Sequence, residues 1–375
     1  MIKYCWVLVF LCACSKSAPV PDLPEPPPVP TYQWVAQERV FGFYNQYRYS
    51  YCPSVVKDGS GFTHMFFCGN PEQTIMVDNI YHVKWQEGQA LTEAKSVLQP
   101  GVLGSWDDHH TCDPSIVQGE FSMGGEKYTY AMFYLTNPYS AYYNEVGVAF
   151  SNSVDGDSWV KYPKQIVSKP WTYEGDELLP NGGKSWGVGQ PSAFTLDKKG
   201  KVILTYTVGD IQGTRIEWAE LDLSDMDKFQ RRNGNRMVQN GLVNIGYTGQ
   251  DYTCNSDFAV DIEKNKIVMV RPVQPHPSTY PAFLNESLEV NYMDLSDFMA
   301  GSGKWEVMLR ISPYMTGFAR NHNAGLERNG FGEISKWEEP TVYFTVSKAA
   351  PEVSAGTTTH AEWTYHIYRG KIVKQ

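Results

Sequence analysis

Three carboxylic acids, Asp113, Glu145 and Asp257, have the chemistry and setting for general acid–base work. Hydrolysis by a carboxyl pair requires one group ionised and the other protonated. Asp113, which precedes Pro114, is the first candidate for the ionised group. Glu145 is the first candidate for the acid, because it follows an aromatic loop that would desolvate it and raise its pKa. Asp257 is the second candidate for the acid.

Each of these acids also has a structural interpretation. Asp113 could make an Asx-type backbone hydrogen bond beside Pro114. Glu145 could be a solvated carboxylate at the edge of a strand. Asp257 could make a contact within a cap or a turn. The choice depends on which elements hold the three side chains.

A degenerate repeat supplies those elements. In each copy a polar residue and a Pro or small residue are followed by an apolar strand, a short turn and a second apolar strand. The five copies begin at Cys52, Asp113, Gln190, Asn255 and His322. Hairpin turns are expected at residues 58–59, 199–200, 264–265 and 329–330, where Gly or Asn is present.

The spacing of the copies predicts an all-β fold, a five-bladed β-propeller. Third strands are expected at 145–151 and 215–219, and outer strands at 159–160 and 305–308. Four strands per repeat form one blade, and radial repetition removes exposed sheet edges. Residues 34–40 are expected to complete the last blade and close the ring. A β-sandwich is the competing architecture.

In a propeller the first strand of each blade lines the central channel, so the polar residue that begins each copy should face one mouth of that channel. A ligand site at this mouth is favoured over a merely solvated lining. Aromatic residues in the neighbouring loops could wall a sugar-sized cleft. The expected substrate-binding residues are Trp106, His110, Tyr143, Trp186, Gln190, Asn255 and His322.

Metal binding is a weaker interpretation of the same region. His109, His110 and His322 could bind a metal with Asp107 or Asp108, but adjacent histidines alternate faces on a strand. A structural cation held in the channel by Asp, Asn and water oxygens is favoured over a catalytic metal. We expect no cofactor.

The segment 113–116, with Tyr134, residues 146–151 and Trp159, resembles the five-bladed propeller glycosidases. These are the arabinanase and β-xylosidase group, glycoside hydrolase family 43, and their invertase-like relatives. The resemblance implies that Asp113 is the general base or nucleophile. Ser192 stands where the family has its second Asp, and Asp257 takes that sub-position one blade later. The family's Glu would lie near Cys254, so its usual catalytic set is not intact here.

The resemblance implies a glycoside hydrolase-like protein that acts on an oligosaccharide or polysaccharide at the channel mouth. The alternative is a non-catalytic, membrane-tethered propeller that binds glycans. A third interpretation is a purely structural scaffold with a blocked mouth. The formal net charge of −9 and the absence of a basic cluster argue against nucleic acid as a partner.

The N-terminus predicts export. Lys3 precedes an apolar run at 4–13, which is too short to span a bilayer. Cys14 follows a small residue, as in the lipobox of bacterial lipoproteins, which implies acylation (palmitate) at Cys14. An ordinary cleaved signal peptide is the alternative. We expect a signal peptide at 1–14, a Pro-rich linker at 15–32 and the propeller at 33–375. The protein would then be anchored in a bacterial membrane, the outer one in our interpretation, facing the periplasm or the exterior.

Four cysteines remain in the mature domain, Cys52, Cys68, Cys112 and Cys254, and their spacing fits no zinc motif. Export makes disulfides possible. Four half-buried free thiols are the interpretation we favour.

Overall fold

The computed structural model describes residues 31–42, 49–70, 77–138, 143–156, 158–168, 186–210, 213–244, 253–273, 285–347 and 366–375. Contacts divide the chain into two units, Met1–Thr31 and Tyr32–Gln375. The expected signal segment, Cys14 and nearly all of the linker therefore lie outside the described residues. Among the helices that are described, none combines the length and the apolar character needed to cross a membrane.

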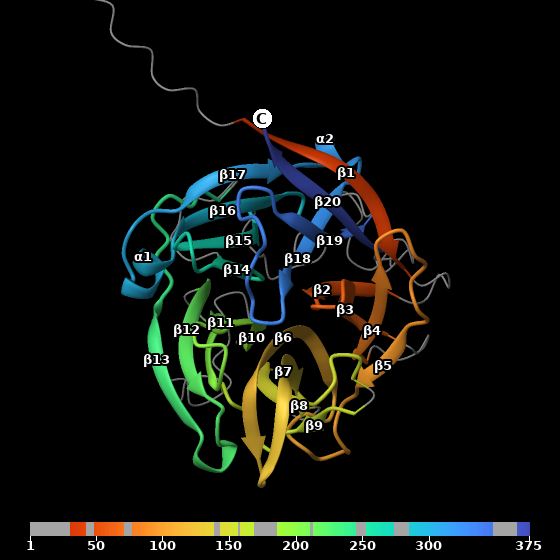
Figure 1. Ribbon diagram of the computed structural model, residues 1–375, viewed down its shortest axis with the longest axis vertical. Coiled ribbons are helices and arrows are strands. Elements are labelled where there is room, and N and C mark those ends of the chain that lie inside the picture. The colour runs from red at the N-terminus through yellow and green to blue at the C-terminus, as the bar shows by residue number, and fades with distance from the viewer. Residues whose placement is uncertain are drawn as a thin grey trace, which may run out of the picture. The chain divides into compact units, whose positions relative to one another are not determined.

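Unit Tyr32–Gln375 is a five-bladed β-propeller in which each blade is a four-stranded antiparallel sheet (Figure 1). Blade 1 contains β2 (Ser50–Lys57), β3 (Phe62–Gly69), β4 (Asn79–Gln86) and β5 (Lys95–Leu98). Blade 2 contains β6 (His110–Met123), β7 (Glu126–Asn137), β8 (Glu145–Ser151) and β9 (Val160–Lys161). Blade 3 contains β10 (Gly187–Phe194), β11 (Lys201–Asp210), β12 (Gly213–Asp222) and β13 (Gln230–Arg236). Blade 4 contains β14 (Asp257–Asp261), β15 (Lys266–Pro272), β16 (Leu288–Asp294) and β17 (Glu306–Ile311).

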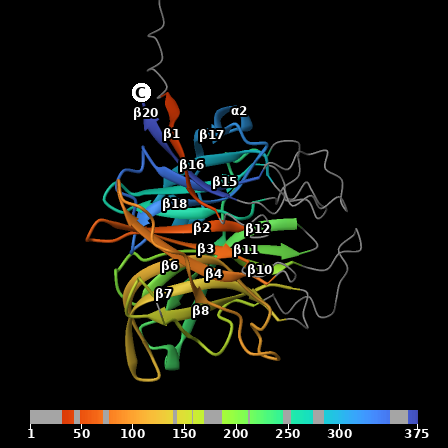
Figure 2. The same cartoon turned by 90° about the vertical axis from the view of Figure 1, so that its right-hand side faces the viewer.

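Blade 5 joins the two ends of the domain. It contains β18 (Arg320–Asn329), β19 (Thr341–Ser347), β20 (His366–Lys374) and, as its outer strand, β1 (Tyr32–Phe41). β1 pairs antiparallel with β20, and the two strands lie side by side in both views (Figures 1 and 2). β18 also makes a short parallel pairing with β2 of blade 1. The prediction that the N-terminal segment completes the last blade is confirmed.

Local sequence explains the blades. The predicted hairpin turns lie where Gly and Asn were found, and Asn265 has a φ of +53°, in the left-handed region that Asn tolerates. Five clusters of buried apolar side chains fill the seams between neighbouring blades. The short helix α1 (Leu295–Ala300) contributes Phe298 to the seam between blades 3 and 4, whereas α2 (Pro313–Thr316) precedes β18.

Small polar residues near the start of the first strands connect successive blades across the channel. In each case a side-chain oxygen accepts the backbone N–H of a residue in the next blade. The acceptor–donor pairs are Ser115 and Ala193 (2.9 Å), Ser192 and Phe258 (3.0 Å), and Asp257 and Leu326 (2.8 Å). In three of the five copies, therefore, the residue two positions after the start carries the side-chain oxygen that connects one blade to another.

Arg328 closes the channel below this layer. Its guanidinium, which is fully buried, extends from β18 and donates to Ser115 Oγ at 2.9 Å, Ser192 Oγ at 3.3 Å and the Phe258 carbonyl at 2.5 Å. The Asp257 carboxylate lies 3.5 Å away and balances its charge. One side chain of blade 5 thus binds blades 2, 3 and 4.

Candidate functional site at the channel mouth

Five residues with the same unusual backbone form a ring at the mouth. Cys52, Asp113, Gln190, Asn255 and Asn323 have φ angles of 51°, 47°, 50°, 48° and 46°. A positive φ costs a non-glycine residue about 1 kcal/mol or more. In four of the five blades the strand register shifts at this point. Such bulges redirect a side chain, here toward the channel.

The ring corrects one prediction. The member from blade 5 is Asn323, whereas the sequence repeat predicts that the fifth copy starts at His322. His322 lies one residue earlier, is buried, and pairs with Thr345 of β19. Because successive residues of a strand alternate faces, an error of one residue moves the wrong side chain into the channel. Cys52, Asp113, Gln190 and Asn255 take the predicted places.

Hydrogen bonds connect the ring residues one to the next. Gln190 Oε1 accepts the Asn255 N–H at 2.7 Å, and the Asn255 amide donates to Asn323. Asn323 Nδ2 donates to Cys52 Sγ at 2.8 Å, and the Cys52 thiol donates to the Asp113 carboxylate. The chain of bonds therefore ends on the one carboxylate of the ring.

The cavity lined by this ring has a volume of about 30 Å³. That volume is enough for one or two water molecules but not for a sugar. A glycan at this mouth would therefore sit above the ring, with only a reacting group directed toward Asp113.

A disulfide lies against Asp113 and corrects our expectation of four free thiols. Cys68 at the end of β3 is bonded to Cys112 of β6, while Cys52 and Cys254 are free and buried. The Asp113 N–H contacts Cys68 Sγ at 2.9 Å, and one carboxylate oxygen lies 3.4 Å from Cys112 Sγ. The bond joins blade 1 to blade 2 directly beside the candidate base.

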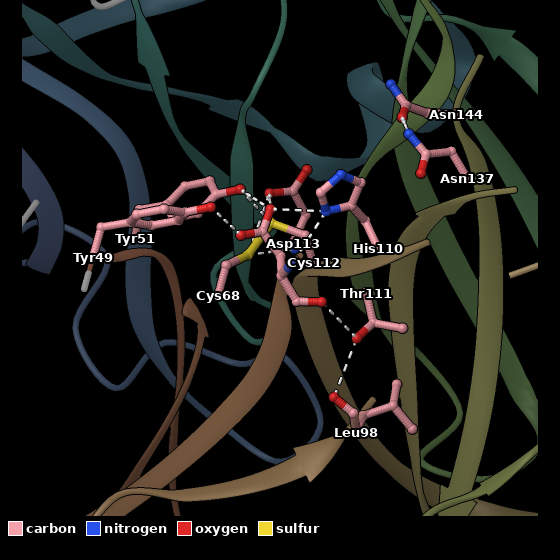
Figure 3. A network of polar contacts seen from close by, with 11 residues as sticks. Tyr49, Tyr51, Cys68, Leu98, His110, Thr111, Cys112, Asp113, Asn137 and Asn144 are labelled. Carbon is pink, nitrogen blue, oxygen red and sulfur yellow. Dashed lines mark hydrogen bonds and ion pairs between the residues drawn. A yellow bond between two sulfur atoms is a disulfide. The ribbon is translucent and has the colours of Figure 1, made fainter. Parts of the chain in front are cut away.

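A second carboxylate, Asp78, lies close to this group although the sequence did not indicate it. It accepts hydrogen bonds from the hydroxyl groups of Tyr49 at 2.5 Å and Tyr51 at 2.7 Å. The Tyr51 hydroxyl also lies 3.1 Å from Cys112 Sγ (Figure 3). This tyrosine therefore connects Asp78 to the disulfide. Asp78 immediately precedes β4, outside any copy of the repeat, and this explains why it was missed.

The surroundings of Asp113 shift its protonation equilibrium. Burial at the mouth raises its pKa, the hydrogen bond from Cys52 lowers it, and the negative charge of Asp78 raises it, with a result of about 6. Asp113 is therefore ionised at neutral pH, yet basic enough to accept a proton.

His110 is held beside Asp78. Its Nδ1 accepts the Asp78 backbone N–H at 3.0 Å, so the proton of the neutral ring is on Nε2. The bond fixes the orientation of the ring at the start of β6. His110 thus presents an N–H donor rather than a metal ligand through Nδ1.

Glu145 lies at the same end of blade 2 as Asp113. It pairs across the sheet with Thr136, which pairs with Thr111 of β6. Residues in one such row share a face, and the Thr111 hydroxyl bonds to the Leu98 carbonyl of blade 1 at 3.1 Å, so this face is turned toward blade 1. Glu145 is buried, and burial raises its pKa to about 7, although a hydrogen bond with Ser168 opposes the shift.

Asp257 is held by protein donors on both oxygens. Oδ1 accepts from the Ser192 hydroxyl at 2.6 Å and faces Arg328, while Oδ2 accepts the Leu326 N–H. These contacts favour a structural role for Asp257 over that of an acid.

The predicted aromatic wall is partly described. Trp186 packs against the cluster formed by Cys52, the disulfide and Leu135 at the mouth. Trp106 packs in the seam between blades 1 and 2, with its ring 6.3 Å from that of Tyr134. Tyr143 is partly exposed and lies two residues before β8. Residues 139–142 and 274–284, which hold other candidate aromatics, lie outside the described residues.

The acidic partners proposed for a metal at the histidines have other contacts. Asp107 binds Lys161 Nζ at 2.6 Å, and Asp108 accepts the Gly104 N–H at 2.6 Å. The thiols and carboxylate of Cys52, Cys68, Cys112 and Asp113 also lie close together. Two of those sulfurs are joined as a disulfide, however, and metal binding requires thiolates.

Loss of the disulfide should destabilise the domain. We expect the double substitution of Cys68 and Cys112 by Ala to lower the free energy of unfolding by about 2–4 kcal/mol, because the bond closes a loop across 44 residues. Equilibrium unfolding in urea measures the change. A reducing agent should lower the midpoint of the unaltered protein and leave that of the double variant unchanged. Equal midpoints for the two proteins under oxidising conditions would contradict the prediction.

No family model and no curated protein matches the chain. Several solved structures, however, match the chain. One is Zg3597, a family 117 glycoside hydrolase of the marine bacterium Zobellia galactanivorans, with a TM-score of 0.56 and 12% identity over 92% of this chain and 90% of that one. An α-L-arabinofuranosidase from Lactobacillus brevis has a TM-score of 0.55 and 9% identity over 88% of this chain and 92% of that one. The α-L-arabinofuranosidase PaAbf62A from Podospora anserina has a TM-score of 0.53 and 8% identity over 92% of this chain and 97% of that one. This chain therefore has the five-bladed propeller fold of these glycoside hydrolases, as the resemblance in its second blade predicted.

Proposed function

We propose that this protein is a glycoside hydrolase that acts at the channel mouth, with Asp113 as the general base or nucleophile and Glu145 as the general acid. The observation that carries the proposal is the placement of Asp113. It is the one carboxylate in a ring of five residues with strained backbones, and its pKa is raised to about 6. Strained, pKa-shifted groups in a concavity are typical of active sites.

Glu145 has the properties required of the acid. Its pKa of about 7 lies above that of Asp113, so one group is protonated while the other is ionised near pH 6.5. Two strand spacings, about 10 Å, separate Glu145 from Thr111 across blade 2. A sugar above the ring would thus meet Asp113 near the axis and Glu145 further out. Glu145 would protonate the leaving oxygen while Asp113 activates water or attacks the anomeric carbon.

Asp78 and His110 support this pair in the proposed mechanism. The charge of Asp78 raises the pKa of Asp113, and the hydroxyl groups of Tyr49 and Tyr51 hold the Asp78 carboxylate in place. His110 would direct its Nε2–H toward a sugar hydroxyl. The solved structures with this fold include arabinofuranosidases, so arabinofuranosyl-substituted glycans are the first substrates to test.

Activity should depend on pH as a narrow bell. Below about pH 6 Asp113 is protonated and cannot act as a base, and above about pH 7 Glu145 is ionised and cannot donate. We expect the maximum of kcat/KM near pH 6.5. Glu145→Gln should remove the descending limb for a substrate whose leaving group needs no protonation, such as an activated aryl glycoside. A profile that stays flat from pH 5 to 8 in the unaltered enzyme would refute both assignments.

A tethered glycan-binding protein is the second candidate. The observation in its favour is that four of the five ring positions hold uncharged groups, and that Asp257 is engaged by Ser192 and Arg328. In either case we propose that the domain is anchored in the cell envelope through Cys14.

One experiment separates the two candidates. Residues 31–375 are tested for release of reducing sugar from arabinans, xylans, fructans and galactans, and for binding to the same glycans. Release supports the hydrolase. Binding without release, unchanged in Glu145→Gln, supports the tethered binding protein.

A further inference from the structure

Two histidines and an aspartate meet at the seam between blades 1 and 2, away from the channel mouth. His64 lies on β3 near its hairpin turn, His82 lies on the adjacent β4, and Asp155 follows β8 of blade 2. Both imidazole rings are buried, whereas the Asp155 side chain is 49% exposed. The two histidines are thus held by two paired strands, and the group is exposed to solvent on the side of Asp155.

The ligand atoms converge. His64 Nδ1 lies 3.1 Å from His82 Nε2 and 3.5 Å from Asp155 Oδ1, and the three atoms all lie within 4.8 Å of one another. Neighbouring ligand atoms around a tetrahedral Zn²⁺ are about 3.3 Å apart, as follows from bonds of about 2.0 Å.

His64 has polar groups on both sides of its ring. His64 Nε2 faces the Asp58 carboxylate at 3.3 Å, while its Nδ1 faces Asp155 and His82. A neutral imidazole has a single proton and can satisfy only one of these sides. With that proton directed to Asp58, Nδ1 presents a lone pair toward His82 and Asp155.

The groups around the three ligands match those of a metal site. With its proton on Nε2, His64 donates to Asp58 and leaves Nδ1 unprotonated on the side of His82 and Asp155, as in the carboxylate–histidine–metal arrangement. Lys84 Nζ holds the second oxygen of Asp155 at 2.8 Å, so that Oδ1 points to the histidines. Phe66 packs on His82 with ring centroids 4.6 Å apart and covers the site from the core.

We propose that His64 Nδ1, His82 Nε2 and Asp155 Oδ1 bind a divalent transition metal, Zn²⁺ by the donor set, with water as the fourth ligand. Two imidazoles and a carboxylate are ligands that Zn²⁺ accepts, and they are too few and too nitrogen-rich for Ca²⁺. The metal joins blade 1 to blade 2 on the side opposite the disulfide. Its role is structural, and it is independent of the proposed hydrolase.

The test uses residues 31–375, freed of metal with a chelator and titrated with Zn²⁺ by calorimetry. We expect one Zn²⁺ per chain and a rise in the thermal midpoint that grows with Zn²⁺ concentration. Co²⁺ in place of Zn²⁺ should give the intense visible absorption of a tetrahedral site. His82→Gln and Asp155→Asn should each weaken binding at least about 100-fold.

His110→Gln is the control, because the adjacent His109 and His110 at the mouth are the alternative place for a zinc ion. This variant should bind Zn²⁺ as the unaltered protein does. Asp155 is half exposed, so Asp155→Asn should retain its circular dichroism and keep the test valid even if His82→Gln fails to fold. Absence of binding, or binding that Asp155→Asn leaves unchanged, overturns the proposal.

Discussion

Asp113→Asn is expected to lower kcat for glycoside hydrolysis about 1,000-fold or more while the propeller remains folded. General-base or nucleophilic assistance accounts for about 10² to 10⁴ in rate, and asparagine neither accepts the proton nor attacks the sugar. The substitution preserves the shape of the side chain and can still accept the hydrogen bond from the Cys52 thiol. The measurement is kcat on the best substrate of the panel, with KM determined alongside it.

Asp197→Asn is the matched control, because Asp197 lies in the turn between β10 and β11 and lines the depression at the opposite face of the propeller. Its kcat should equal that of the unaltered protein. If Asp113→Asn retained full kcat, the ring would be a binding feature and the base would have to be sought elsewhere. A large rise in KM with unchanged kcat would assign Asp113 to substrate binding alone.

Arg328→Met should destabilise the domain by about 3–5 kcal/mol. Removal of one partner of a buried ion pair leaves the other uncompensated. Here the substitution would leave the Asp257 charge without its cation and the Phe258 carbonyl without the arginine donor. Ser115 and Ser192 would each lose one hydrogen bond. Equilibrium unfolding in urea gives the change in free energy.

Arg232→Met provides the comparison for this prediction. Arg232 also pairs with a carboxylate, that of Glu220 at 3.0 Å, but its side chain is 72% exposed. Exposed pairs of this kind contribute about 0–1 kcal/mol. If the two variants lost equal stability, the contacts of Arg328 with three other blades would have no special energetic weight.

Much of the fold could be predicted because the repeat is local. Turn residues and apolar strands recur within each copy, and hairpins depend mainly on nearby sequence. The fifth copy was misplaced by one residue because His322 and Asn323 are both polar and no proline follows. The structure resolves the choice through backbone conformation, since Asn323 shares its positive φ with Cys52 and Asp113.

The site was harder to predict because its parts belong to different elements. Asp113 and Glu145 were accessible through the repeat and the strand order. Asp78 and the Cys68–Cys112 bond were not, because they depend on the packing of blade 1 against blade 2, which no local pattern encodes. Asp257 shows the opposite problem, since its position was predicted but its partner Arg328 lies 71 residues further along the chain.

The pairing of β1 with β20 affects how the chain can reach its native state. Tyr32 pairs with Lys374, so the ring cannot close until nearly the whole domain has been synthesised. Bringing such distant ends together costs about 5 kcal/mol of chain entropy, which the last contacts must offset. A chain whose N-terminus is made first therefore carries β1 without its partner strand until β20 has been added.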